Sequence, residues 1–234
     1  MLPRPYYTLF MLLSLAVFLA ARQLLPKSPA LARLTWRQRT MLALAGFIGG
    51  AFGAKLPFID TGDGFWTGVW FRDGKTITTG LVGAYLGVEL AKIALNLRIK
   101  TGDSFAIPLA LALAVGRWGC YFNGCCFGQS TSLPWGVDFG DGVPRHPTQL
   151  YEFVFHLGMA GVLWLLMQQG MLVNHRLKLY LIAYCAYRFA TEMIRLEPAA
   201  YLGLTLYQAI VAIFGMALAM QWIWDTRSEQ LTSR

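Results

Sequence analysis

The sequence predicts an all-α integral membrane protein with about seven transmembrane helices. Of its 234 residues, 56% are hydrophobic and only 14% are charged, whereas an ordinary soluble domain carries roughly 25% charged residues. The apolar residues occur in runs of about 20, the length that a helix needs to cross a bilayer. Because these runs and their short connections use up the chain, we expect residues 1–234 to form a single polytopic transmembrane domain.

Seven segments carry this prediction, and their limits follow the ends of the apolar runs. They are Tyr6–Leu25, Thr40–Lys55, Thr79–Leu97, Phe105–Phe122, Thr148–Gln168, Leu177–Arg195 and Leu204–Trp224.

The first three segments each have a distinguishing feature. The first has the length of a signal peptide, but Ala20-Ala21-Arg22-Gln23 is a poor cleavage site, so we expect a retained span. The four glycines within residues 46–53 of the second segment suit close helix–helix approach, and we expect this segment to be short or tilted. In the third, Glu89 and Lys92 are one helical turn apart, which favours an ion pair.

The fourth and fifth segments flank the most unusual stretch of the chain, residues 116–152, where charges and thiols lie at the edge of hydrocarbon. The sixth places Tyr184, Arg188 and Glu192 on one helix face, because these residues are four apart. The seventh is an apolar run that ends before basic residues. Ionisable groups inside a membrane segment indicate function by default, since their burial is unfavourable.

The loop charges predict the orientation of the chain. Eleven lysines and arginines fall in the loops on one side of the seven segments and six on the other, which also holds most of the loop aspartates. The positive-inside rule therefore places the N-terminus outside and the C-terminus in the cytoplasm. The loop from Phe122 to Pro147 and the Gly- and Asp-rich loop from Phe58 to Lys75 are then expected to face outward.

Several functions are disfavoured. The net charge of +8 does not indicate nucleic-acid binding, because the basic residues lie in loops between apolar runs. The sequence has no phosphate-binding Gly-rich loop, dinucleotide fingerprint or HExxH zinc pattern. We therefore expect neither a cofactor nor a metal.

Arg117 and Arg188 are the leading candidates for a site. One interpretation is that Arg188 forms an internal ion pair with Glu192 that locks the helix packing. The other is that Glu192 orients Arg188 for a phosphate, whose oxygens match the planar guanidinium. With Arg117 on another segment, two buried arginines would hold an anionic headgroup.

Cys120, Cys125 and Cys126 lie near the predicted outer face, where thiols can oxidise. Three interpretations remain open: a disulfide or structural packing, a catalytic or acyl-carrying thiol activated by Arg117 or His146, and a metal site. The C-x4-C-C spacing differs from the C-x-x-C pairs of structural zinc, which argues against the last.

Two other residues have simpler alternatives. His146 either caps the start of the fifth segment or acts as a base, because histidine titrates near neutral pH. Cys185 lies in the middle of the sixth segment and is expected to be a small buried hydrophobic residue.

At these residues the chain resembles the bacterial prolipoprotein diacylglyceryl transferases. That family's hallmarks are a Gly-Arg-x-Gly-Asn-Phe-x-Asn-x-Glu-x-x-Gly element, then Pro-Trp-Gly, then His-Pro-Ser-Gln-Leu-Tyr-Glu, and a Tyr-x-x-x-Arg-x-x-x-Glu-x-x-Arg helix. The matching residues are Tyr7, Asp103, Pro108, Gly116, Arg117, Gly119, Asn123, Gly128, 134–136, 146–152, Tyr184, Arg188, Glu192 and Arg195.

The resemblance implies an enzyme of the bacterial inner membrane whose site opens toward the outer leaflet. Such an enzyme moves the diacylglyceryl group of phosphatidylglycerol, or a similar anionic phospholipid, onto the lipobox cysteine thiol of a prolipoprotein and releases glycerol phosphate. The resemblance implies that Arg117 and Arg188 bind the phosphate and stabilise the leaving group, and we add His146 and Cys125 as further catalytic candidates from their own chemistry. The implied substrate-binding residues are Tyr7, Asn123, Gly128, Gln149, Tyr151, Tyr184 and Glu192.

The chain departs from the family at three places. Cys120 stands for an asparagine, Cys125 for the signature glutamate, and Thr78-Thr79-Gly80 for a His-Gly-Gly element. Without that histidine, the acceptor thiol lacks an obvious proton acceptor. The alternatives are a divergent glyceryl or phosphoglyceryl transferase with another acceptor, a non-catalytic phospholipid-binding protein, and a thiol-based membrane redox protein.

Overall fold

The computed structural model describes residues 5–58, 76–201 and 203–232. These residues fall into two compact units, one made of Met1–Ser28 and Thr101–Arg234, the other of Pro29–Lys100. The predicted outward loop from Phe58 to Lys75 lies outside the described residues except for Phe58 itself.

The predicted all-α membrane class is confirmed at the level of its helices. Six helices in the described part of the chain are long and apolar enough to cross a membrane: Tyr6–Leu24, Trp36–Phe58, Ile77–Ala94, Asp103–Phe122, Thr148–Gln168 and Leu206–Ser228. The remaining predicted segment forms α8, Arg176–Thr191, followed by the short helix η2, Glu192–Ile194. At 16 residues, α8 is shorter than the roughly 20 residues of a typical span.

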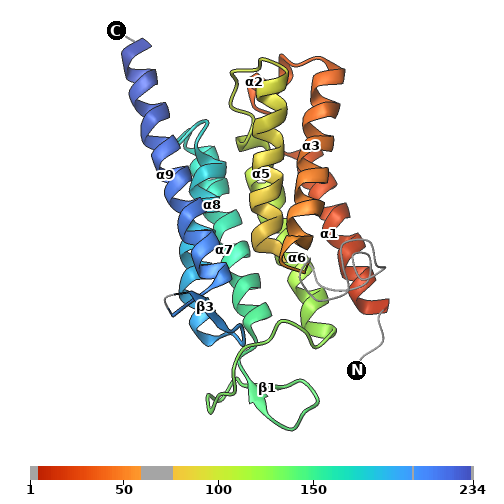
Figure 1. Ribbon diagram of the computed structural model, residues 1–234. Helices are drawn as coiled ribbons and strands as arrows, with labels where there is room; N and C mark the ends of the chain where they lie inside the picture. Colours follow the sequence, from red (N-terminus) through yellow and green to blue (C-terminus); the bar gives the residue numbers. More distant parts are fainter. Residues whose placement is uncertain (1–4, 59–75, 202, 233–234) are drawn as a thin grey trace. The chain divides into compact units, whose positions relative to one another are not determined.

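The first unit contains five long helices (Figure 1). They are α1 (Pro5–Leu24), α6 (Asp103–Phe122), α7 (Thr148–Gln168), α8 and α9 (Leu206–Thr232). Helix α6 packs against both α1 and α7, and α8 packs against α9. Helices α7 and α8 run antiparallel, because Glu152 near the start of α7 lies by Arg188, whereas His156 one turn later contacts Tyr180.

Two small hairpins connect the helices at one end of this unit (Figure 1). Strand β1 (Val137–Asp138) pairs antiparallel with β2 (Pro144–Arg145), and β3 (Ala199–Tyr201) pairs with β4 (Leu204–Thr205). An isolated bridge joins Gly128, in the loop after α6, to Arg195 after η2. A Cβ atom on Gly128 would lie 2.5 Å from the carbonyl oxygen of Ile194, so only glycine fits this junction.

The second unit is a helical pair formed by α3 (Trp36–Lys55) and α5 (Ile77–Ala94), with the short helices α2 (Pro29–Ala32) and η1 (Leu56–Phe58). A Cβ atom on Gly49 would lie 2.4 Å from the carbonyl oxygen of Gly83, which confirms the predicted close approach. The expectation that this segment is short was wrong, because a capping box at Thr35 starts α3 four residues before the predicted limit at Thr40, and α3 has 20 residues.

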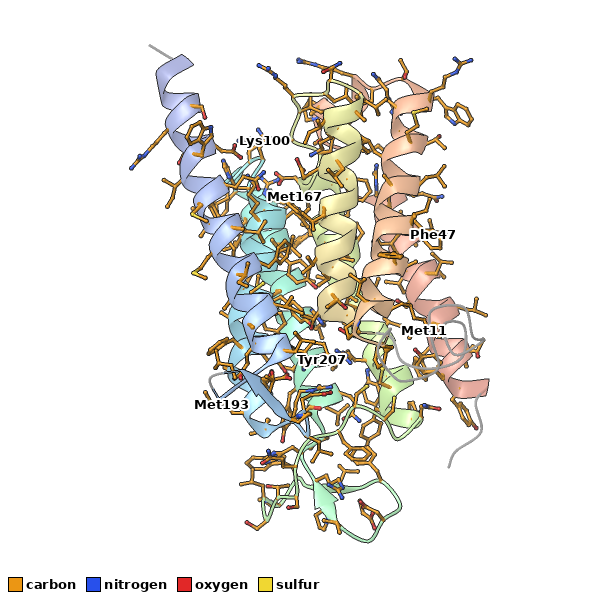
Figure 2. All side chains as sticks on the ribbon, in the orientation of Figure 1. Met11, Phe47, Lys100, Met167, Met193 and Tyr207 are labelled. Carbon is orange, nitrogen blue, oxygen red and sulfur yellow. The ribbon has the colours of Figure 1, made fainter. Side chains whose placement is uncertain are left out.

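The second unit bears out one further sequence prediction. The ammonium of Lys92 lies 2.7 Å from Glu89 Oε1, so the predicted ion pair forms. Large apolar side chains cover the outer surface of α3, and Figure 2 shows Phe47 pointing away from the helix, with 75% of its surface exposed. Such a surface suits contact with lipid, as expected for a helix that crosses the membrane.

Candidate functional site

A buried cluster of three arginines and two glutamates lies where α6, α7, α8 and η2 meet. Arg117 of α6 forms an ion pair with Glu152 of α7, and Arg188 of α8 lies 2.8 Å from Glu192. The Glu152 carboxylate also lies 3.7 Å from Arg188 and 4.0 Å from Arg195. Each of these side chains is at most 10% exposed. Three guanidinium groups against two carboxylates leave one net positive charge in this arginine cluster.

The arginine cluster contains unused hydrogen-bond donors. Arg117 Nε and Arg188 Nε are buried, and no hydrogen bond joins them to the described residues, whereas Arg188 Nη1 lies 3.7 Å from Glu152 Oε1. Buried donors without acceptors are unfavourable by about 1–3 kcal/mol each, so they are rare unless a ligand completes them. An anion with several oxygens would satisfy these donors and the excess charge together.

Neighbouring side chains fix Arg188 in place. Its guanidinium carbon lies 5.5 Å from the centre of the Tyr207 ring, which Figure 2 labels at the start of α9. Its partner Glu192 accepts a hydrogen bond of 3.1 Å from Thr205 Oγ1. The predicted ion pair of Arg188 with Glu192 is therefore present, and both of its members are held by α9 and the hairpin before it.

His156 is a buried residue that sequence reasoning missed. It lies one turn after Glu152 on α7, its Nδ1 is 2.8 Å from the hydroxyl of Tyr180, and its ring stacks on Tyr184 at 5.4 Å. The sequence offered one signal for His156: it follows Glu152 by four residues, and residues i and i+4 share a helix face. Arg195 was likewise noted only as a motif match, although it follows Glu192 by three residues.

Cys120, in the last turn of α6, and Cys125 and Cys126, in the loop after it, form a second cluster beside Arg117. Their sulfur atoms all lie within 4.8 Å of one another, and those of Cys125 and Cys126 are 3.8 Å apart. All are free thiols, so the disulfide considered from the sequence is not formed. Arg117 Nη1 lies 4.0 Å from the sulfur of Cys120, which joins this thiol cluster to the arginine cluster.

Two residues of the His146–Glu152 motif hold the thiol cluster. Thr148 Oγ1 donates to the carbonyl oxygen of Cys126, and Gln149 Nε2 donates to that of Cys125. Hydrogen bonding with the thiols of Cys120 and Cys125 holds the pKa of the Cys126 thiol below its usual range, and the charge of Arg117 acts in the same direction. Cys126 is therefore the cysteine most easily ionised.

The other predicted site residues lie around these two clusters. His146 Nδ1 is 3.2 Å from the hydroxyl of Tyr151, which also accepts a hydrogen bond of 2.9 Å from Trp135 Nε1. Asn123 ends α6, its N–H donating to the carbonyl oxygen of Gly119. The site residues predicted from the sequence therefore lie in three places: the arginine cluster, the thiol cluster, and a group of three aromatic side chains formed by His146, Tyr151 and Trp135.

Tyr7 and Cys185 complete the comparison with the sequence. A Cβ atom on Gly119 would lie 3.5 Å from the carbonyl oxygen of Tyr7, so α1 brings this tyrosine to the end of α6 that carries the thiol cluster. Cys185 is 5% exposed and packs against Gly215, which confirms its prediction as a buried hydrophobic residue.

Comparison with known proteins gives one family. The family model described as prolipoprotein diacylglyceryl transferase matches residues 3–224. The phosphatidylglycerol–prolipoprotein diacylglyceryl transferase of Cupriavidus necator is 31% identical over 213 residues, covering 85% of this chain and 78% of that protein. The protein of the same name from Polynucleobacter asymbioticus is 29% identical over 235 residues, covering 93% and 85%. Enzyme 1 of Streptomyces coelicolor is 37% identical over 164 residues, covering 67% and 46%.

Proposed function

The chain belongs to the prolipoprotein diacylglyceryl transferase family, and we propose that it moves the diacylglyceryl group of phosphatidylglycerol onto the lipobox cysteine thiol of a prolipoprotein. The names of its relatives specify both the lipid and the prolipoprotein. They favour this function over the alternatives of a different acceptor and of a lipid-binding protein without activity.

The arginine cluster is the observation that carries the proposal. The phosphodiester of phosphatidylglycerol bears one negative charge, which matches the one net positive charge of three arginines and two glutamates. The unused N–H donors of Arg117 and Arg188 come from two different helices and would hold the phosphate from two sides. As the C–O bond to the phosphate breaks, the same donors stabilise the charge on the departing glycerol phosphate.

An apolar groove in the first unit supports a lipid as the ligand. It has a volume of about 450 Å³ and is lined by Ala21, Leu24, Leu25, Ile107, Leu111, Leu157, Ala160, Gly161 and Trp164. Because a helix rises 1.5 Å per residue, Ile107 lies roughly 15 Å along α6 from Arg117. We place one acyl chain in this groove and the phosphate at the arginines.

We further propose seven transmembrane helices in a single domain, with α8 and η2 as the sixth span. The antiparallel packing of α8 against α7, seen in the pairs Arg188–Glu152 and Tyr180–His156, supports this count. The loop charges then place the N-terminus in the periplasm, the C-terminus in the cytoplasm, and the site toward the outer leaflet of the bacterial inner membrane.

The other predicted residues take supporting roles in this proposal. Tyr7, Asn123, Tyr184 and Tyr151 shape the headgroup pocket, while Gly128, Gln149 and Glu192 fix the loop and the arginines. His146 and Cys125 are the two candidates for handling the proton of the acceptor thiol.

A mass-spectrometric transfer assay tests the function. The purified protein is incubated with phosphatidylglycerol and a synthetic lipobox peptide, and the peptide is expected to gain one diacylglyceryl group. Arg117→Ala is expected to abolish the gain, whereas Arg145→Ala, which breaks the exposed pair with Asp141, is expected to retain it. An unmodified peptide, with lipid binding intact, would favour the non-catalytic alternative.

A further inference from the structure

The thiol cluster has a geometry that the proposed function does not use. Its three sulfur atoms lie within 4.8 Å of one another. Thiolates bound to one ion at metal–sulfur distances of about 2.3 Å are separated by roughly 3.8 Å in a tetrahedral site and 4.0 Å in a trigonal one. The Cys125–Cys126 sulfur distance of 3.8 Å falls in this range. We propose that Cys120, Cys125 and Cys126 bind one thiophilic metal ion, either Zn²⁺ with one coordination position left open or Cu⁺ in a trigonal site that the three sulfurs complete.

The backbone explains how neighbouring cysteines reach one ion. Gly124 has a φ of +63° and Cys126 a φ of +64°, so the chain turns back twice within three residues. The N–H of Cys125 donates to the carbonyl oxygen of Cys120 at 3.1 Å and closes this turn. A positive φ is unfavourable for cysteine and persists only where the surroundings impose it. This loop does not form the regular C-x-x-C turn of structural zinc sites, so its C-x4-C-C spacing does not prevent the three sulfurs from reaching one ion.

The loop is held in this conformation by buried side chains. Thr148 and Gln149 are at most 1% exposed, and their hydrogen bonds fix the carbonyl groups of Cys126 and Cys125. Support of this kind fixes the ligands of protein metal sites, because it orients them before the ion arrives. The three sulfurs therefore need little rearrangement to bind an ion.

The surrounding charges also suit a thiolate site. Three thiolates with Zn²⁺ carry a net charge of one negative unit, and with Cu⁺ two. Arg117 lies 4.0 Å from the sulfur of Cys120, and the charge of Arg195 acts on Cys126. These two guanidinium groups would reduce the unfavourable energy of the negative charge without cancelling it, because they also face the two glutamates and the lipid phosphate. Soft thiolate ligands select Zn²⁺ and Cu⁺ over hard cations such as Mg²⁺ or Ca²⁺.

The open position suggests a role that rests on the proposed function. The sulfur of the lipobox cysteine would occupy it and release its proton to solvent, since a thiol that coordinates a metal ion is deprotonated. The resulting thiolate attacks the glyceryl carbon, a C–S bond forms, and the C–O bond breaks with its electron pair leaving on the phosphate. The ion would thereby replace the missing base of a chain that has Thr78-Thr79-Gly80 in place of His-Gly-Gly.

Elemental analysis of the purified chain tests the site directly. The protein is purified under reducing conditions without a polyhistidine tag, and its zinc and copper contents are measured by mass spectrometry. We expect about one equivalent of one of them, and its identity distinguishes Zn²⁺ from Cu⁺. Cys126→Ser is expected to lower the content at least roughly ten-fold, whereas the control Cys185→Ala, which removes the buried thiol of α8, is expected to retain it.

A second readout keeps the test valid if a variant fails to fold. After chelation, the wild-type protein is titrated with Co²⁺, and a sulfur-to-metal charge-transfer band is expected to saturate at one equivalent. Absence of both bound metal and this band, or an intact mass lower by two hydrogens from a disulfide within the cluster, would overturn the metal site.

Transfer activity separates the site from the function. Activity that is lost on chelation and restored by Zn²⁺ supports the catalytic role. Full activity in metal-free protein overturns that role and leaves the proposed function standing. Bound metal without transfer under any condition supports the site and contradicts the proposed function.

Discussion

Glu152 is the residue whose replacement tests the arginine cluster most sharply. Its carboxylate is 1% exposed and lies within 4.0 Å of three guanidinium groups, those of Arg117, Arg188 and Arg195. The change Glu152→Gln keeps the size of the side chain, removes its charge and replaces one accepting oxygen by an NH2 group that donates. Glu192 then remains as the single carboxylate for three arginines.

The expected loss of stability follows from this geometry. Removing one partner of a buried ion pair typically destabilises a protein by about 3–5 kcal/mol. Because the amide oxygen of glutamine can still accept a hydrogen bond from Arg117, we expect the lower end of this range, about 3 kcal/mol. Transfer activity is expected to fall roughly 100-fold, because the guanidinium groups lose the anion that orients them toward the phosphate.

The assay compares the replacement of a buried glutamate with the replacement of an exposed aspartate. Thermal unfolding in detergent and the rate of peptide modification are measured for Glu152→Gln and for the matched control Asp141→Asn, which breaks the exposed ion pair with Arg145. The control is expected to behave like the wild type. If Glu152→Gln unfolds at the wild-type temperature with wild-type activity, the claim that this carboxylate organises the arginines is wrong.

Three further predictions concern other parts of the chain. Gly83→Val is expected to separate α3 from α5 and lower the unfolding temperature, because its Cβ would lie 2.2 Å from the carbonyl oxygen of Gly49. The control is Gly158→Ala, because a Cβ atom at this position would have no neighbour within 4 Å. Gly128→Ala is expected to reduce transfer activity while the helical circular dichroism persists, since its Cβ would displace Ile194 from the loop after α6; unchanged activity would show that this junction does not position the site. Peptide mapping of the metal-free, reduced protein after brief iodoacetamide treatment near neutral pH is expected to find Cys126 labelled before Cys125. Cys126 is exposed and its pKa is lowered, whereas the pKa of Cys125 is raised by hydrogen bonds to the other thiols. Equal labelling would contradict this order.

The limits of a helix were predictable from the sequence where hydropathy changes abruptly. They were not predictable where a local hydrogen bond sets the first residue of the helix. Helix α7 has the predicted limits, Thr148–Gln168, because a proline precedes it and polar residues follow it. Helix α9 continues past the predicted end at Trp224 to Thr232, since a helix can extend into polar surroundings without a change in its backbone bonds. No hydropathy argument could find the capping box that starts α3 inside a basic segment.

The arginine cluster was partly predictable for a similar reason. Charges inside apolar runs are visible in a sequence, so Arg117, Arg188 and Glu192 were found. Glu152 was noted as an ionisable residue at a span end, but its contact with three arginines depends on how α6, α7 and α8 pack. The convergence of the three thiols depends on two left-handed residues, and spacing rules contain no such information.

A structure of the protein with bound phosphatidylglycerol would test the central claim most directly. The claim is that the phosphate of the lipid completes the arginine cluster. We predict phosphate oxygens within about 3 Å of Arg117 Nε and Arg188 Nε, two donors without a hydrogen bond among the described residues, with an acyl chain along the groove beside Ile107 and Trp164. A phosphate bound elsewhere, with these donors still unpaired, would contradict the account.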